Sequence, residues 1–142
     1  MESAQRVYGV DHWETMIMTE QHARLLVKTG KAAEAEPLYA KLMHFADSLP
    51  VTHWRAAYHR GAFGWMLLEQ RRFEEAEPLL KAALEGMQRI FGDGHPRTVA
   101  ALETIIRLYG DWNSAEPGKG YAAKADEYRA LLEAKHEDAP GK

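Results

Sequence analysis

Histidines are the residues of this chain best suited to bind a metal or to transfer protons, and there are seven of them. His12, His53 and His95 recur at steps of 41 and 42 residues. Equivalent positions on helices packed roughly 8–10 Å apart cannot bring three imidazoles within about 2.0–2.1 Å of one zinc ion. We therefore interpret these three as residues that begin helices. His59 lacks the four-residue spacing from His53 of a helical metal pair, and His22 is expected in a largely core position.

Catalytic motifs are not apparent elsewhere in the chain. No Ser-His-Asp or HExxH arrangement and no glycine-rich phosphate loop is seen, and the absence of cysteine excludes disulfides and thiolate metal sites. The sequence therefore predicts a protein that is not an enzyme, with no catalytic residue, no metal and no cofactor.

The strongest pattern is an internal repeat. The residues Glu34-Ala35-Glu36-Pro37-Leu38 recur unchanged as Glu75-Ala76-Glu77-Pro78-Leu79, an offset of 41 residues. Self-similarity at a fixed period of this length is typical of stacked supersecondary units. Such arrays present long surfaces for contact, and their repeats seldom carry catalytic residues.

Composition limits the partners and the location. The formal net charge is −3, and the lysines and arginines form no block, so nucleic acid and anionic membranes are not expected partners. Strong helix formers are abundant. No apolar run is long enough to cross a bilayer, and the first residues lack a signal-peptide core. We expect an all-helical cytoplasmic protein.

The repeat predicts one helical domain over residues 1–142. Its expected parts are a remnant of a preceding repeat over 1–10, repeat 1 over 11–49, repeat 2 over 50–92, a degenerate repeat 3 with a cap helix over 93–136, and a tail over 137–142. The expected helices cover about 11–28, 32–48, 53–70, 73–91, 96–109 and 121–135.

Turn signals separate these helices. Gly30 allows a left-handed turn, Arg71-Arg72 replaces it in repeat 2, and Thr52 is expected to cap the following helix. Residues 110–120 are rich in glycine, proline, asparagine and serine and are expected to form a loop.

The first residues match the end of a helix rather than its start. Residues 5–9 resemble residues 88–92, two periods later, so the chain is expected to open inside a repeat unit. Either it is an excerpt from a longer array or its first unit has decayed into a short cap. We favour the excerpt, and we therefore expect an unsatisfied stacking surface around Val7 and Tyr8 and a homodimer through this end.

These motifs resemble tetratricopeptide repeats, in particular the kinesin-light-chain-like repeats of about 42 residues. The resemblance rests on His53-Trp54, Met66-Leu67 and residues 70–80 in repeat 2, and on the matching residues of repeat 1. Repeat 3 keeps His95-Pro96 and Leu108-Tyr109 but loses the Glu-Ala-Glu-Pro motif. The resemblance implies a right-handed α-solenoid of about three antiparallel helix pairs.

Small residues support this packing without reference to the family. Ala23 and Gly64 on the first helices of their units, and Ala35 and Ala76 on the second, are small where two helices must approach closely.

The resemblance also implies that the first helix of each unit lines a concave surface. The candidates for peptide binding on that surface are Glu20, Gln21, Arg24, Lys28, Tyr58, Trp65, Glu103 and Arg107. Trp65 is expected between Arg24 and Arg107, and Gly61 and Ala62 leave space beside it. An indole between two guanidinium forks is suited to anchor a peptide that carries carboxylates. The asparagines that many relatives carry here are absent, so the resemblance implies no particular ligand.

Two alternatives stay open. The pairs Arg24–Glu20 and Arg107–Glu103 are also explained as ordinary ion pairs one helical turn apart on a solvated face. For the function, we expect a module that binds a peptide or partner protein on the concave face, as part of a larger scaffold or signalling protein. The alternative is a structural array that self-associates or docks onto other domains.

Overall fold

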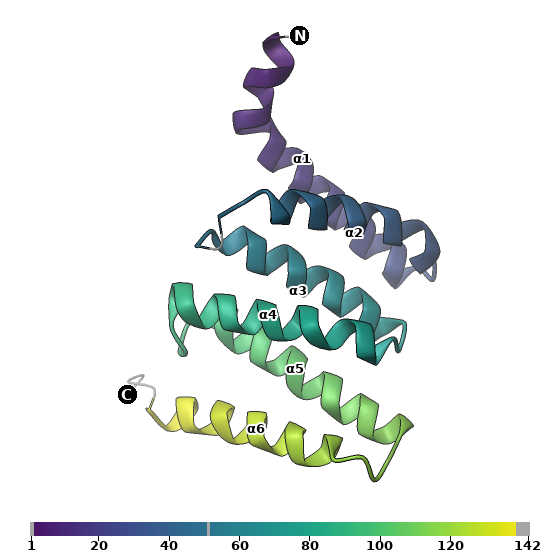
Figure 1. Ribbon diagram of the computed structural model, residues 1–142, viewed down its shortest axis with the longest axis vertical. Helices are drawn as coiled ribbons and strands as arrows, with labels where there is room; N and C mark the ends of the chain where they lie inside the picture. The colour runs from purple at the N-terminus through teal and green to yellow at the C-terminus, as the bar shows by residue number, and fades with distance from the viewer. Residues whose placement is uncertain (1, 51, 139–142) are drawn as a thin grey trace.

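The computed structural model describes residues 2–50 and 52–138, with side-chain environments for 14–50 and 52–134. In chain order, its helices are α1 (Glu2–Lys28), α2 (Ala32–Asp47), α3 (Trp54–Glu69), α4 (Phe73–Phe91), α5 (Pro96–Ala115) and α6 (Tyr121–Asp138). Each helix packs against the next, and α3 also touches α1 and α5. Figure 1 shows the resulting stack, an all-helical repeat solenoid.

Close approach within each helix pair depends on the small residues of the repeat. Ala23, Ala35 and Ala76 are completely buried. A Cβ added at Gly64 would lie 2.7 Å from a methyl carbon of Leu80, so α3 and α4 pack too closely there for any larger residue. Space is therefore limited at these positions by the neighbouring helix.

The turns inside the first two units have the same left-handed geometry. Gly30 adopts a φ of 85°, and Arg71, which replaces it in the second unit, adopts a φ of 60°. A positive φ strains a residue with a Cβ, so the turn is preserved at some energetic cost. Next to it, Arg72 bridges the units through Glu36 at 2.9 Å and Glu75 at 2.7 Å.

Histidine side chains cap two of the helices. Nδ1 of His53 accepts a hydrogen bond from the backbone N–H of Arg55 at 3.2 Å, and Nδ1 of His95 accepts one from Arg97 at 3.1 Å. The interpretation of these two residues as helix starts is therefore confirmed. The expected cap at Thr52 is wrong, because the helix begins one residue later. His12 lies inside α1, so its interpretation as a helix start is wrong, and its side chain is outside the described residues.

Helix α1 begins earlier than the repeat predicts. It runs without interruption from Glu2, so the expected helix start near Asp11 is wrong. Gly9 is the only glycine before Lys28 and no proline occurs there, so a single unfavourable residue does not end the helix. The N-terminal part of α1 extends beyond the stack (Figure 1). The assignment of residues 1–10 to a preceding repeat stays a prediction.

Helix α5 continues into the segment expected to be a loop. It ends at Ala115 instead of near Tyr109, which leaves only a short connection before α6. Trp112 explains the difference: it is buried and its ring stacks on Tyr121 and Phe73, with centroids at 4.1 Å and 5.7 Å. Burial of a large aromatic surface outweighs the weak helix propensity of the neighbouring glycine and asparagine.

His22 is exposed, so the expectation of a core imidazole is wrong. The equivalent Phe63 on α3 packs against Tyr39 of α2, with ring centroids 5.7 Å apart. Within the described residues, α1 has no helix on the corresponding side, because its neighbours are α2 and α3.

The described residues include neither a helix that could cross a membrane nor a cluster that could hold a metal ion. None of the described helices is long and apolar enough to cross a membrane. Within the same residues, no group of three or more histidine, aspartate or glutamate side chains is placed to hold a metal ion.

Candidate functional site

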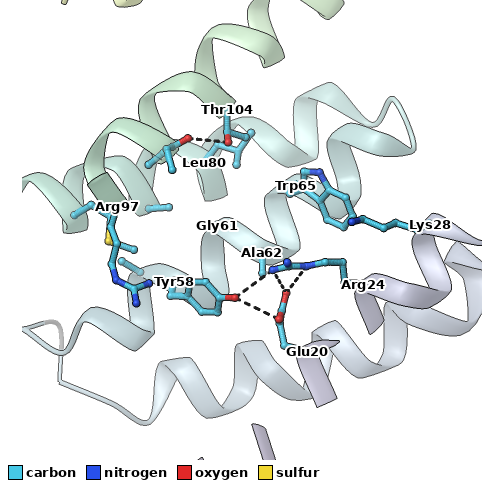
Figure 2. Close-up of a pocket in the computed structure, with 15 residues that line it drawn as sticks. Glu20, Arg24, Lys28, Tyr58, Gly61, Ala62, Trp65, Leu80, Arg97 and Thr104 are labelled. Atoms are coloured by element: carbon cyan, nitrogen blue, oxygen red, sulfur yellow. Dashed lines mark hydrogen bonds and ion pairs between the residues drawn. The ribbon is translucent and has the colours of Figure 1, made fainter. Parts of the chain in front are cut away.

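A groove of about 410 Å³ runs across the first helices of the three units. Figure 2 shows its side chains, which come from α1, α3, α4 and α5. The residues that line it are Glu20, Arg24, Lys28, Ala57, Tyr58, Gly61, Ala62, Trp65, Leu80, Ala83, Met87, Arg97, Ala100, Ala101 and Thr104.

Most of the candidate residues proposed from the sequence lie in this groove. The five that line it are Glu20, Arg24, Lys28, Tyr58 and Trp65. Gln21, Glu103 and Arg107 are on the same helices but outside the lining, and all three are exposed. Their assignment to peptide binding stays a prediction.

Glu20, Arg24 and Tyr58 form one polar network (Figure 2). Nη2 of Arg24 donates to Glu20 at 2.7 Å and to the Tyr58 hydroxyl at 3.2 Å, and that hydroxyl donates to Glu20 at 3.3 Å. Glu20 is only 3% exposed. The Arg24 guanidinium and the Tyr58 hydroxyl compensate its buried charge from two sides. Burial, followed by the nearby Glu20 carboxylate, raises the pKa of Tyr58 and keeps its hydroxyl protonated.

This network is more than the solvated ion pair that the sequence also allowed. An exposed pair is worth little, whereas breaking a buried one leaves an uncompensated charge. Arg24 therefore has a structural role in holding Glu20, whatever it does for a ligand.

Arg107 has other partners than the sequence suggested. Its guanidinium pairs with Glu69 of α3 at 2.7 Å and with Asp111 at 3.3 Å. The alternative explanation by a pair with Glu103 is wrong, because the side chain turns toward α3 and toward Asp111. The contact with Glu69 ties the second unit to the third.

Two cations of the groove have no carboxylate partner among the described residues: Lys28 and Arg97. They lie at opposite ends of the groove in Figure 2. The guanidinium of Arg97 lies over the Trp54 ring, 4.2 Å from its centroid. Sequence analysis missed Arg97, although it is one turn before Ala100 on the same helix face and could have been found by that spacing.

The floor of the groove was not expected from the sequence. Leu80, Ala83 and Met87 belong to α4, the second helix of its unit, whereas only the first helices were expected to line this surface. These three residues line the groove because the α3 residues above them, Ala57 and Gly61, are too small to cover them.

Trp65 forms part of the groove wall. Its side chain is partly buried and packs against the hydrophobic core, so one face of the ring is fixed and the rest is accessible. A fixed, partly accessible indole offers contact area at a low cost in side-chain entropy.

The fold and the groove define an α-helical repeat protein with an open, preformed contact surface. Residues 57–97, which span α3, α4 and the start of α5, match the family model described as tetratricopeptide repeat. This match, over less than half of the chain, supports a repeat protein of the tetratricopeptide type. Repeats of this family are in general protein–protein interaction modules and are typically not enzymes. No curated protein and no solved structure gave a match.

Proposed function

We propose that this protein is an interaction module that binds a peptide segment of a partner protein in the concave groove. The observation that carries the proposal is the pair of cations, Lys28 and Arg97, that have no carboxylate partner among the described residues and lie in one groove with Trp65. The resemblance of the repeats supports placing such a module in a larger scaffold or signalling protein of the cytoplasm.

The charge of the groove indicates the kind of peptide. Its lining holds three cations, Arg24, Lys28 and Arg97, and one anion, Glu20, a balance of +2. The whole chain has a net charge of −3, so the groove is locally opposite in sign to the molecule. Such a surface favours a peptide that carries carboxylates, and its attraction falls with added salt.

The experiment is selection from a displayed library of random 12-residue peptides, followed by binding measurements with the selected peptides. We expect Trp65→Ala to weaken binding by about 2 kcal/mol, roughly thirtyfold, because buried tryptophan dominates interface energies. The double variant Lys28→Gln/Arg97→Gln is expected to weaken binding and to reduce its salt dependence.

Matched controls lie outside the groove. Lys41→Gln on α2 removes an exposed cation, and Leu131→Ala on α6 removes a large side chain that is 46% exposed. Selected peptides that bind all variants equally would contradict the proposal and would move the contact surface elsewhere.

A second candidate function is self-association, and one observation favours it. Met18 and Leu25 of α1 are 67% and 59% exposed, whereas the equivalent residues of α3, His59 and Met66, are completely buried. An apolar stripe of this kind is suited to contact another helix.

A further inference from the structure

The two junctions between repeat units are built from side chains of different size. At the first junction α3 meets α1 and α2, and at the second α5 meets α3 and α4. An offset of 41 residues relates α1 to α3 and α2 to α4, and an offset of 42 relates α3 to α5. The two junctions can therefore be compared position by position.

At most of the positions that line the groove, the second junction has the smaller side chain. The first-junction residue and its smaller counterpart are Met16 and Ala57, Glu20 and Gly61, Gln21 and Ala62, Tyr39 and Leu80, Leu42 and Ala83, Tyr58 and Ala100, and His59 and Ala101. Among the other positions that line the groove, the order is reversed at Ile17 and Tyr58, Arg24 and Trp65, Ala46 and Met87, and Ala62 and Thr104. The second junction therefore lacks several side chains that the first uses to fill its interior.

The missing volume appears in the structure as part of the groove. At the first junction Tyr39, Leu42 and His59 are completely buried. At the second, the smaller counterparts all line the open groove. A Cβ at Gly61 would lie 3.2 Å from that of Ala83, so these two residues form a closed floor and the space is above them, beside α5.

We propose that this space, the apolar notch bounded by Gly61, Ala83, Met87, Ala100 and Ala101, receives one bulky apolar side chain of the bound peptide. The inference rests on the proposed function and specifies its ligand. The occupant is an aromatic, leucine or methionine side chain, because the first junction fills the equivalent space with its own Tyr58 and Leu42.

The chemistry of the notch agrees with an apolar occupant. Its bounding side chains carry no hydrogen-bonding group, and the nearby Thr104 hydroxyl already donates to the Ala100 carbonyl at 3.0 Å. Tyr58 and Trp65 supply aromatic surface at its edge (Figure 2). Carboxylates of the peptide would contact Lys28 and Arg97 at the two ends of the groove and stay outside the notch.

The test is to give the second junction the side chains of the first. Ala100→Tyr reproduces Tyr58, and Ala83→Leu reproduces Leu42. We expect the peptides selected from the displayed library to share one bulky apolar residue. Each variant should weaken their binding about tenfold or more, because the notch is then already filled. Ala122→Tyr, at an exposed position of α6, is the matched control.

Thermal unfolding of Ala83→Leu tests the notch independently of any ligand. Filling a real space leaves the melting temperature unchanged or raises it, whereas a lower melting temperature would overturn the proposal.

Binding results separate this inference from the proposed function. Peptides that lose affinity for Trp65→Ala but bind Ala100→Tyr normally, or that need no bulky residue, would overturn the notch and leave groove binding intact. Peptides insensitive to every groove variant would overturn both.

Discussion

The buried imidazole of His59 links the stability of the protein to pH. It is completely buried between the Phe45 and Tyr58 rings, and neither nitrogen has a hydrogen-bond partner among the described groups. Burial, together with the positive charge of Arg55, lowers its pKa to about 4. Such a residue is accommodated only in its neutral form.

This pKa predicts a loss of stability in mild acid. Between the unfolded pKa of about 6.5 and the folded pKa of about 4, the unfolded chain binds the proton more readily, so the free energy of unfolding falls as pH falls. From pH 7 to pH 5 the loss is about 2 kcal/mol. Urea unfolding of the wild type and His59→Met measures it, with exposed His44→Gln as control. An equal pH dependence in wild type and His59→Met would contradict the assignment.

Ala76 is the residue where added volume is expected to do the most damage. It is completely buried on the face of α4 that approaches α3. Ala76→Leu should cost roughly 1–3 kcal/mol or more through overpacking, seen as a lower melting temperature. Exposed Ala82→Leu on the same helix is the control. An unchanged melting temperature for Ala76→Leu would mean that the repeat register is wrong.

At the scale of the elements, the sequence predicted the helices better than their ends. The period placed α2, α3 and α4 within about two residues, because capping and turn residues mark their boundaries. It failed at α5, where a glycine-containing segment stays helical through the contacts of Trp112. Such contacts join residues far apart in the chain, and local composition carries no signal of them.

The same limit applies to the candidate site. Spacing alone brought Glu20, Arg24, Tyr58 and Trp65 to one face, because equivalent helix positions recur at the repeat period. It could not show that α4 reaches the groove, which depends on how little of that helix the alanines and Gly61 cover. The choice of ion-pair partner by Arg107 likewise depends on the distance between α3 and α5.

Trp112 is expected to determine how far α5 extends. Trp112→Ala removes a side chain that is 4% exposed and should cost about 3–5 kcal/mol. The last turn of α5 should unwind at the same time, which lowers the helical signal in circular dichroism. The partly accessible Trp65 provides the comparison. Trp65→Ala should lower the free energy of unfolding clearly less than Trp112→Ala. Equal losses of stability for the two variants would contradict the role of Trp112.

At the scale of the whole molecule, the two outer helices of the stack differ. Helix α1 exposes the apolar stripe of Met18 and Leu25, whereas the exposed described residues of α6 are charged residues and alanines, with Leu131 as the exposed large hydrophobic residue. Val7 and Tyr8, predicted to form an unsatisfied stacking surface, have side chains outside the described residues. The predicted homodimer through this end stays a prediction.

Sedimentation velocity over a concentration series tests whether the protein forms this homodimer. If α1 mediates association, the wild type should sediment faster as concentration rises, and Met18→Glu/Leu25→Glu should remain monomeric because burying a carboxylate in an apolar contact is costly. Leu131→Glu on α6 is the control. A wild type that is monomeric at all concentrations would contradict self-association and leave peptide binding as the candidate function.

The difference between α1 and α6 gives the stack a direction. A repeat unit added before α1 would find an apolar surface ready to cover, whereas one added after α6 would have to bury charged side chains such as Asp126, Glu127 and Arg129. For protein engineering, we therefore expect consensus units to be grafted more readily ahead of α1 than after α6.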